Sequence, residues 1–328
     1  LFDDLVSKDD FVLLDVRNDV EFGRFKVEGP YPVDMINVPY MEFIEHEEES
    51  VAKVPSGRKI RIVCAKEGSA KYVGEILNNH GFEDVHYLRE GIKSWGNLLT
   101  PIKVSEETAY DLYQFRRPGK ASCSYGLVYA KEMMLFDPAK NIAAYRQFAE
   151  KQGCSITHTF ETHRQADYIS GSQPLNQAVG AAIMAPEPDF SEAKFLYTPV
   201  NDGDVYPFSD NTNGMPEVKV LHTPGHTPGS TCYLIDNKYL ISGDTVFIYS
   251  IGRPDLGGMA EAWSAMLFKT MREKRLKWDD TIHVLPGHSL SGEDAAPDLR
   301  CMEARGTLKA INSESYSIDK REDVDQFS

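Results

Sequence analysis

Imidazole and carboxylate side chains stand at three places in the second half of the sequence where they could bind a metal ion. His163 and Asp244 each follow a predicted strand, and a strand end holds a side chain in a fixed direction. His222 and His226 flank a turn that Pro224-Gly225 restricts, so we expect only one of these two histidines to face the metal. Any one of the histidines alone could instead be an ordinary surface or core residue.

A second candidate for chemistry is Cys64, which directly follows the strand predicted over residues 59–63 and precedes a predicted helix. A thiol at a helix N-terminus lies among backbone N–H groups, which lower its pKa and stabilise a thiolate or persulfide anion. Lys66 adds positive charge nearby. The same spacing also suits a buried structural cysteine.

The elements around Cys64 predict a compact α/β unit. Short apolar runs over residues 11–16, 59–63 and 85–88 are typical of buried strands. Residues 70–79 have helical spacing and end before Gly81. Strands that alternate with helices indicate a parallel sheet. Pro118-Gly119 and the polar residues around it predict a domain boundary near residues 100–122.

The second half is a strand-rich series that carries the candidate metal ligands. We predict strands over residues 125–129, 133–136, 155–160, 218–221, 231–235, 238–241 and 282–285, and a helix over 142–152. Asp236-Asn237 is typical of a hairpin turn. Asp137-Pro138 is interpreted as a strand break, and residues 313–328 as a polar tail.

Residues 1–102 resemble a rhodanese. Asp15-Val-Arg17 with Glu21-Phe22 is similar to the early signature of that family, and Gly91-Ile-Lys-Ser-Trp95 to its late one. The resemblance implies that Cys64 carries sulfane sulfur and exchanges it with thiosulfate or sulfite. Many rhodaneses place an arginine late in the loop, where this chain has Ser69-Ala70.

Residues 105–312 resemble the metallo-β-lactamase fold, an αββα sandwich. The matching motifs are Glu161-Thr-His163…Asp167, His222-Thr-Pro-Gly-His226-Thr-Pro-Gly-Ser230, Ser242-Gly-Asp244-Thr and Pro286-Gly-His288. Gly252-Arg253-Pro-Asp255-Leu narrows the resemblance to persulfide dioxygenases of the ethylmalonic-encephalopathy-protein type. The expected fold class is therefore α/β, a parallel-sheet rhodanese domain followed by this sandwich.

The resemblance also implies a site. One Fe(II) per chain would be held by His163, His226 and Asp244, a set that suits a single iron with open positions better than a zinc pair. Arg253 would bind the carboxylate of a thiol carrier such as glutathione through its forked guanidinium.

The chain departs from the family motif His-x-His-x-Asp-His at two positions, Gln165 and Tyr168. Asp167 and His288 alone make a poor second metal site, so a two-metal hydrolytic mechanism is disfavoured. Gln165 could still orient a metal-bound water, and Tyr168 could hydrogen-bond Asp167. Changes around metal ligands often cost about 10–100-fold in activity or affinity.

Three functions remain open. The first is oxidation of a low-molecular-weight thiol persulfide to sulfite at Fe(II), coupled to sulfur transfer at Cys64. In the second, the C-terminal domain is catalytically silent and all chemistry occurs at Cys64. The third is a mononuclear zinc thioester hydrolase, which ranks last because Gln165 removes the usual third zinc ligand. The resemblance to persulfide dioxygenases favours a homodimer.

Composition excludes other classes. The 328 residues, with 41% hydrophobic and 11% aromatic side chains, suit one large or two ordinary globular domains. A net charge of −15 argues against nucleic acid and anionic membranes as partners. The five cysteines are scattered without a CxxC pair, and no apolar run spans a membrane, so we expect a reducing, cytoplasmic location.

Overall fold

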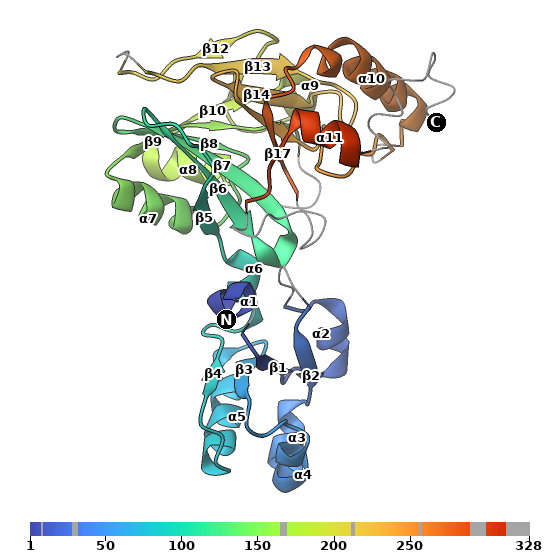
Figure 1. The fold of residues 1–328 in the computed structure, drawn as a ribbon. Coiled ribbons are helices and arrows are strands. Elements are labelled where there is room, and N and C mark those ends of the chain that lie inside the picture. The colour runs from blue at the N-terminus through green and yellow to red at the C-terminus, as the bar shows by residue number, and fades with distance from the viewer. Residues whose placement is uncertain are drawn as a thin grey trace. The chain divides into compact units, whose positions relative to one another are not determined.

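We describe a computed structural model of the chain, which covers residues 1–7, 9–27, 32–164, 169–210, 214–255, 258–288 and 300–312. The chain forms two compact units, shown in Figure 1. The first comprises Leu1–Leu99 with Arg117–Lys120, and the second comprises Thr100–Arg116 and the described residues from Ala121 onward. Among the described helices, none has the length and apolar character needed to cross a membrane.

The first unit is a parallel sheet in the order β2-β1-β3-β4 with helices packed around it. Its strands are β1 (Phe11–Asp15), β2 (Asp34–Asn37), β3 (Lys59–Val63) and β4 (Val85–Tyr87). Its helices are α1 (Phe2–Ser7), α2 (Asp19–Arg24), α3 (Tyr40–Glu45), α4 (Glu47–Ala52), α5 (Glu67–Asn79) and α6 (Ile92–Asn97), with a 3₁₀ turn over Pro118–Lys120. β1 is buried along its whole length, as the apolar run predicted.

The second unit is a sandwich of two mixed sheets. The seven-stranded sheet has the order β11-β10-β9-β8-β7-β6-β5 and the six-stranded sheet the order β12-β13-β14-β15-β16-β17. The first contains β5 (Thr100–Lys103), β6 (Asp111–Arg117), β7 (Ser122–Tyr129), β8 (Glu132–Phe136), β9 (Ser155–Phe160), β10 (Ala182–Ala185) and β11 (Thr198–Pro199). The second contains β12 (Val205–Tyr206), β13 (Val218–His222), β14 (Thr231–Ile235), β15 (Tyr239–Gly243), β16 (His283–Pro286) and β17 (Glu303–Ala304).

Helices cover the outer faces of this sandwich (Figure 1). α7 (Ile142–Gln152) and α8 (Ser172–Val179) pack on the seven-stranded sheet, where both contact β9. α10 (Ala260–Glu273) and α11 (Arg305–Ile311) lie beside the six-stranded sheet, and a short α9 (Glu187–Phe190) follows β10. The α/β fold class and the αββα arrangement expected from the sequence are confirmed.

An aromatic cluster between the two sheets fixes the end of β9, from which the first candidate ligand follows. Phe136 and Phe160 stack with ring centroids 5.0 Å apart, and Tyr233 of β14 meets Phe160 edge-on at 5.2 Å. The Tyr233 hydroxyl donates a hydrogen bond to the carbonyl oxygen of Glu161, at 2.7 Å. Ring packing and this bond together hold the chain immediately before His163.

Two hairpins form in this unit, β7–β8 and β14–β15, and the second turns at Asp236-Asn237 as predicted. Ala130 has φ +50°, and Asp236 and Asn237 both have φ +52°, the left-handed conformation that tight two-residue hairpin turns require. Between residues 100 and 117, where the sequence predicted only a boundary, the chain forms β5 and β6. The predicted tail over 313–328 lies outside the described residues.

Candidate functional site

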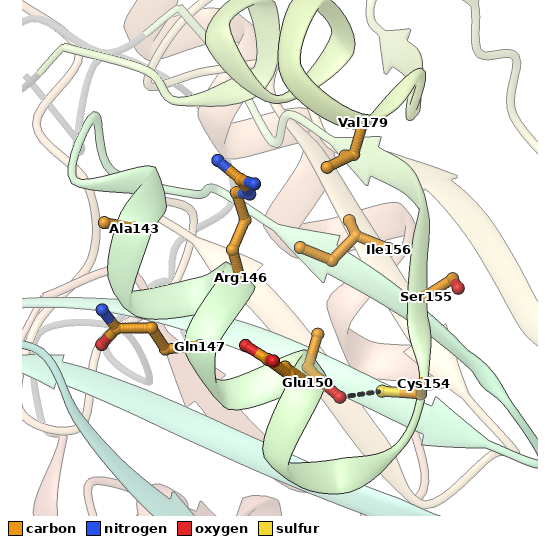
Figure 2. A pocket seen from close by; sticks show the side chains of 9 residues that line it. Ala143, Arg146, Gln147, Glu150, Cys154, Ser155, Ile156 and Val179 are labelled. Atoms are coloured by element: carbon orange, nitrogen blue, oxygen red, sulfur yellow. Dashed lines mark hydrogen bonds between the residues drawn. The ribbon is translucent and has the colours of Figure 1, made fainter.

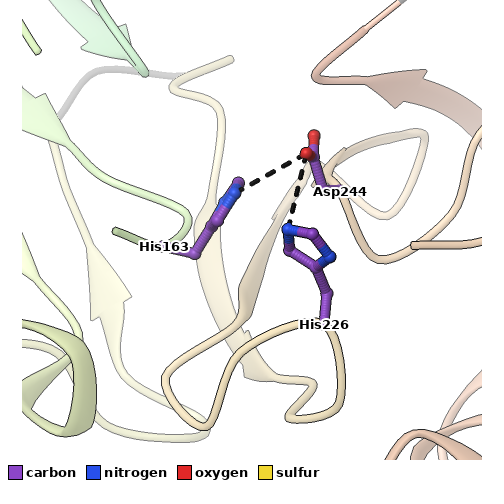
Figure 3. Close-up of side chains that lie close together, drawn as sticks. All are labelled: His163, His226 and Asp244. Carbon is purple, nitrogen blue, oxygen red and sulfur yellow. Dashed lines mark ion pairs between the residues drawn. The ribbon is translucent and has the colours of Figure 1, made fainter. Parts of the chain in front are cut away.

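Three side chains from different segments converge in the second unit (Figure 3). His163 follows β9, His226 lies in the β13–β14 connection, and Asp244 directly follows β15. The Nε2 atoms of His163 and His226 lie 3.7 and 3.6 Å from Asp244 Oδ2, and the three ligand atoms all lie within 4.8 Å of one another. Ligand atoms about 2.1 Å from one metal ion are roughly 3–4 Å apart, so this donor set fits a single ion.

The ring of His163 is oriented by Thr162. The Thr162 hydroxyl donates its proton to Asp137 Oδ2, at 2.8 Å, and lies 2.8 Å from His163 Nδ1. A hydroxyl has one proton, so His163 must donate from Nδ1 to the Thr162 oxygen. The lone pair of His163 is therefore on Nε2, the atom that faces Asp244.

His226 is fixed in the same tautomer by a backbone carbonyl. Its Nδ1 lies 2.9 Å from the carbonyl oxygen of Arg253, which can only accept a hydrogen bond, so Nε2 carries the lone pair. His222 points elsewhere, because its Nε2 donates to the carbonyl oxygen of Pro228 at 3.1 Å. Of the two histidines flanking the turn, the structure brings His226 to the other ligands.

Burial keeps the imidazole of His163 in the form that a metal needs. His163 and His226 are only 2% and 5% exposed. Burial, followed by the nearby His226 and His288, lowers the pKa of His163 well below its ordinary value. The neutral ring, with its Nε2 lone pair available, is therefore the stable form at neutral pH.

His288 lies beside Asp244 because β15 and β16 run parallel, and a shift in register after Ile241 brings Gly243 opposite Pro286. His288 Nε2 is 3.6 Å from Asp244 Oδ2. A Cβ atom at Gly287 would lie 2.5 Å from Asp244 Oδ1, so only glycine allows this close approach. The other three residues predicted to lie around the metal ligands, Gln165, Asp167 and Tyr168, lie outside the described residues.

The side chain of Arg253 is not part of the metal-binding cluster. It is 67% exposed, and its Nε and Nη2 donate to the two carboxylate oxygens of Asp255, each at 2.6 Å. Arg253 lowers the pKa of Asp255 to about 2, so this pair stays ionised at neutral pH. The two bonds to Asp255 use Nε and Nη2 of the guanidinium, so Nη1 is directed away from that carboxylate.

A buried carboxyl group lies just before the first ligand. Glu161 is 1% exposed, and Ser170 and Ser172 both donate hydrogen bonds to its Oε1. Burial, with Asp137 nearby, raises the pKa of Glu161 to about 8. These contacts tie the residues after β9 to the start of α8.

In the first unit, Cys64 directly follows β3 and is 4% exposed. Its carbonyl oxygen accepts a hydrogen bond from the N–H of Ile92, at 2.8 Å, and α5 begins three residues later at Glu67. A Cβ at Gly91 would lie 2.5 Å from the carbonyl oxygen of Ala65, and Gly91 has φ +73°. The start of α6 is therefore packed tightly against the Cys64 loop.

Another cysteine, Cys154, lines a pocket (Figure 2). The pocket, of about 690 Å³, lies at the start of β9, and His163 follows the other end of that strand. Burial raises the pKa of Cys154, and its Sγ lies 3.6 Å from the carbonyl oxygen of Ala149. A thiol with a raised pKa is a weak nucleophile, so Cys64 remains the candidate for sulfur chemistry.

Sequence reasoning missed three residues that support the ligands: Asp137, Thr162 and Asp189. Asp137 was interpreted only as a strand break, although an aspartate directly after a buried strand resembles the signal that singled out Asp244. Nothing in the local sequence marks Thr162 or Asp189, because their roles depend on contacts between distant segments.

Comparisons with known proteins agree with this architecture. Residues 118–290 match the model of the metallo-beta-lactamase superfamily, and residues 1–98 match the rhodanese-like domain. The chain belongs to the metallo-beta-lactamase superfamily, and it carries a rhodanese domain before that fold.

The chain is also similar in sequence to several hydroxyacylglutathione hydrolases. A hydroxyacylglutathione hydrolase of Rhizobium etli is 34% identical over 174 residues, which cover 51% of this chain and 64% of that protein. The chain spans less than two thirds of the length of this and similar hydrolases from Rhizobium johnstonii and Brucella ovis.

Two solved structures have a similar fold. A metallo-beta-lactamase from Staphylococcus aureus is 30% identical with a TM-score of 0.58, covering 67% of this chain and 66% of that one. ETHE1 from Myxococcus xanthus is 22% identical with a TM-score of 0.55, covering 66% and 87%. The second likeness shows the fold alone.

Proposed function

We propose that the chain is a sulfur-metabolising enzyme that oxidises a low-molecular-weight thiol persulfide to sulfite in its second unit and transfers sulfane sulfur at Cys64 in its first. The observation that carries the proposal is one compact set of two imidazoles and one carboxylate in the same chain as a rhodanese cysteine loop. Such a set suits a single Fe(II) with open positions.

Each residue of the metal centre has a definite task in this proposal. His163 and His226 present their Nε2 atoms toward Asp244, which supplies a carboxylate oxygen. When bound, Fe(II) would supply the electron chemistry that lets O₂ react with sulfane sulfur. The protein fixes the ligand directions through Thr162 and the Arg253 carbonyl before the metal arrives.

Two further residues would handle the substrate. The guanidinium of Arg253, oriented from one side by Asp255, binds a carboxylate of the thiol carrier, for which glutathione is the first choice. The Cys64 thiolate attacks the sulfane sulfur of the carrier persulfide, which breaks the carrier S–S bond and releases the carrier as a thiol, and Cys64 becomes a persulfide. Sulfite then takes that sulfur as thiosulfate and releases the Cys64 thiolate. Sulfite is also the product proposed for the second unit, so the two chemistries are complementary.

A second candidate function is hydrolysis of a glutathione thioester at a single zinc ion. The matches to hydroxyacylglutathione hydrolases favour it. In this reading His288, which lies next to Asp244, helps to hold a nucleophilic water. Glutathione is the carrier in both proposed functions. They differ in the group on its sulfur, a persulfide or an acyl thioester, and in the metal, Fe(II) or zinc.

The test measures O₂ uptake and sulfite release by Fe(II)-loaded protein given glutathione persulfide and, in parallel, coenzyme A persulfide. Zinc-loaded protein is given a glutathione thioester. We expect one sulfite per O₂ consumed and no thioester cleavage. The His226→Ala variant should lose both iron and O₂ uptake.

His222→Ala is the matched control for that variant, because its ring points away from the ligands and the variant should keep both properties. Thioester cleavage without O₂ uptake would establish the hydrolase instead. Protein that holds no metal, with sulfur transfer intact at Cys64, would show that the second unit is catalytically silent.

A further inference from the structure

One carboxylate joins the two segments that carry the histidine ligands. Asp189 Oδ2 accepts a hydrogen bond from the backbone N–H of Arg164, at 2.9 Å, directly after His163. The same oxygen accepts from the Thr227 hydroxyl, at 2.7 Å, directly after His226. A residue of α9, remote from both ligands in sequence, therefore contacts the neighbour of each.

The second oxygen of Asp189 strengthens this connection. Asp189 Oδ1 accepts from the backbone N–H of Gly229, at 2.7 Å, in the His226 segment. A Cβ at Gly229 would lie 2.5 Å from Asp189 Cγ, so the glycine is what lets the segment come this close. Two of the three donors, the N–H groups of Arg164 and Gly229, belong to the backbone, so Asp189 contacts the main chain of both ligand segments directly.

Asp189 is 9% exposed, and in the described parts of the chain no ion pair involves it. Its charge is therefore balanced by neutral donors from the two ligand segments rather than by a cation. A buried carboxylate is stable only while those donors stay in place, so the carboxylate and the two segments fix one another.

We infer that Asp189 is a positioning residue that sets the separation of the His163 and His226 rings and so prepares the metal site. The inference rests on the metal-binding part of the proposed function and not on which reaction follows. Residues that orient metal ligands typically contribute about 10–100-fold to metal affinity. We expect an effect of that size from Asp189.

The test uses Co(II) alone as the probe, with affinity from chelator competition and ligand geometry from the visible spectrum at saturating metal. Asp189→Asn has only one acceptor oxygen, so its amide N–H₂ must face the N–H donor of either segment. We expect Co(II) affinity to fall about 10–100-fold and the spectrum to change in the full chain. Glu187→Gln is the matched control on α9, because Glu187 contacts the Tyr197 hydroxyl instead, and it should match wild type.

A milder pair of variants keeps the test decisive if Asp189→Asn does not fold. Thr227→Val removes one of the three bonds and should weaken Co(II) binding several-fold, and Thr227→Ser keeps the hydroxyl and should restore it. Wild-type affinity and an unchanged spectrum in folded Asp189→Asn or in Thr227→Val would overturn the inference. Wild-type protein that binds no Co(II) would overturn the metal centre itself, which is a separate result.

Discussion

The hydroxyl of Thr162 stands between a buried carboxylate and a metal ligand, and its single proton decides the tautomer of His163. Thr162→Val removes the acceptor for the Nδ1 proton, so the ring loses its fixed direction. We predict about a 10–100-fold loss of metal affinity, measured by chelator competition.

Thr162→Ser keeps the hydroxyl and should recover most of that loss. The thermal unfolding of both metal-free variants separates a general loss of stability from an effect on the ligand. Equal affinity in wild type and Thr162→Val would show that His163 needs no such partner.

The exposed guanidinium of Arg253 gives a second prediction at this scale. Arg253→Ala should raise KM for the thiol carrier about 10–100-fold with little change in kcat, because a charge-assisted contact far from the reacting atoms adds uniform binding. Arg253→Lys should not restore the low KM, since an ammonium group cannot form the forked pair of hydrogen bonds with a carboxylate. Lys269→Ala removes an exposed positive charge from α10 and controls for the change in net charge. An unchanged KM for Arg253→Ala in steady-state kinetics would contradict the proposed role of Arg253 in binding the carrier.

Local sequence predicted the three candidate ligands that lie together in the structure, but not the residues that orient them. His163 and Asp244 each follow a predicted strand, and that position can be recognised within a few residues. Asp189 is hydrogen-bonded to Arg164, 25 residues away in sequence, and to Thr227, 38 residues away. Such contacts arise from the packing of the two sheets, which periodicity does not encode.

Among the elements, the loop that carries Cys64 depends on the first residues of α6. Gly91→Ala places a Cβ against the Ala65 carbonyl and adds strain at φ +73°. We predict a loss of about 1–3 kcal/mol of stability and a marked loss of thiosulfate sulfurtransferase activity.

Gly96→Ala is the matched control in the same helix, because its nearest neighbour would be a Phe25 ring carbon at 3.9 Å. Thermal unfolding and sulfur-transfer assays of the two variants check the prediction. A Gly91→Ala protein as active as Gly96→Ala would show that the Cys64 loop is held by other contacts.

Several elements predicted from the sequence contain strong apolar runs, as in β1, β3 and β14. β6 was missed because Asp111–Arg117 mixes charged with apolar residues, and β2 because only four residues pair along β1. In both, the strand conformation is imposed by neighbouring strands rather than by the segment's own pattern.

At the scale of the whole molecule, the proposed metal centre and the proposed sulfur chemistry at Cys64 belong to different compact units. Metal removal should therefore lower the stability of the second unit alone. A ligand at a hundred times its Kd stabilises the unit that binds it by about 2.7 kcal/mol. Hydrogen exchange with and without metal should change around His163, His226 and Asp244 and leave β1 and β3 unaffected.

Cys64→Ser is the control for this experiment, because it should abolish sulfur transfer and leave the metal-dependent protection in place. Equal changes in both units on metal removal would show that they are thermodynamically coupled.

Arg253 has two separate roles, one that depends on its side chain and one that depends only on its backbone carbonyl. The side chain of Arg253 is the proposed contact for the carrier, but the bond that orients His226 comes from its backbone carbonyl, which every amino acid possesses. Mutation at this position can thus exchange the recognition group while the ligand orientation is inherited unchanged. Descendants of this chain could diversify in substrate by single substitutions there without passing through a form that has lost its metal.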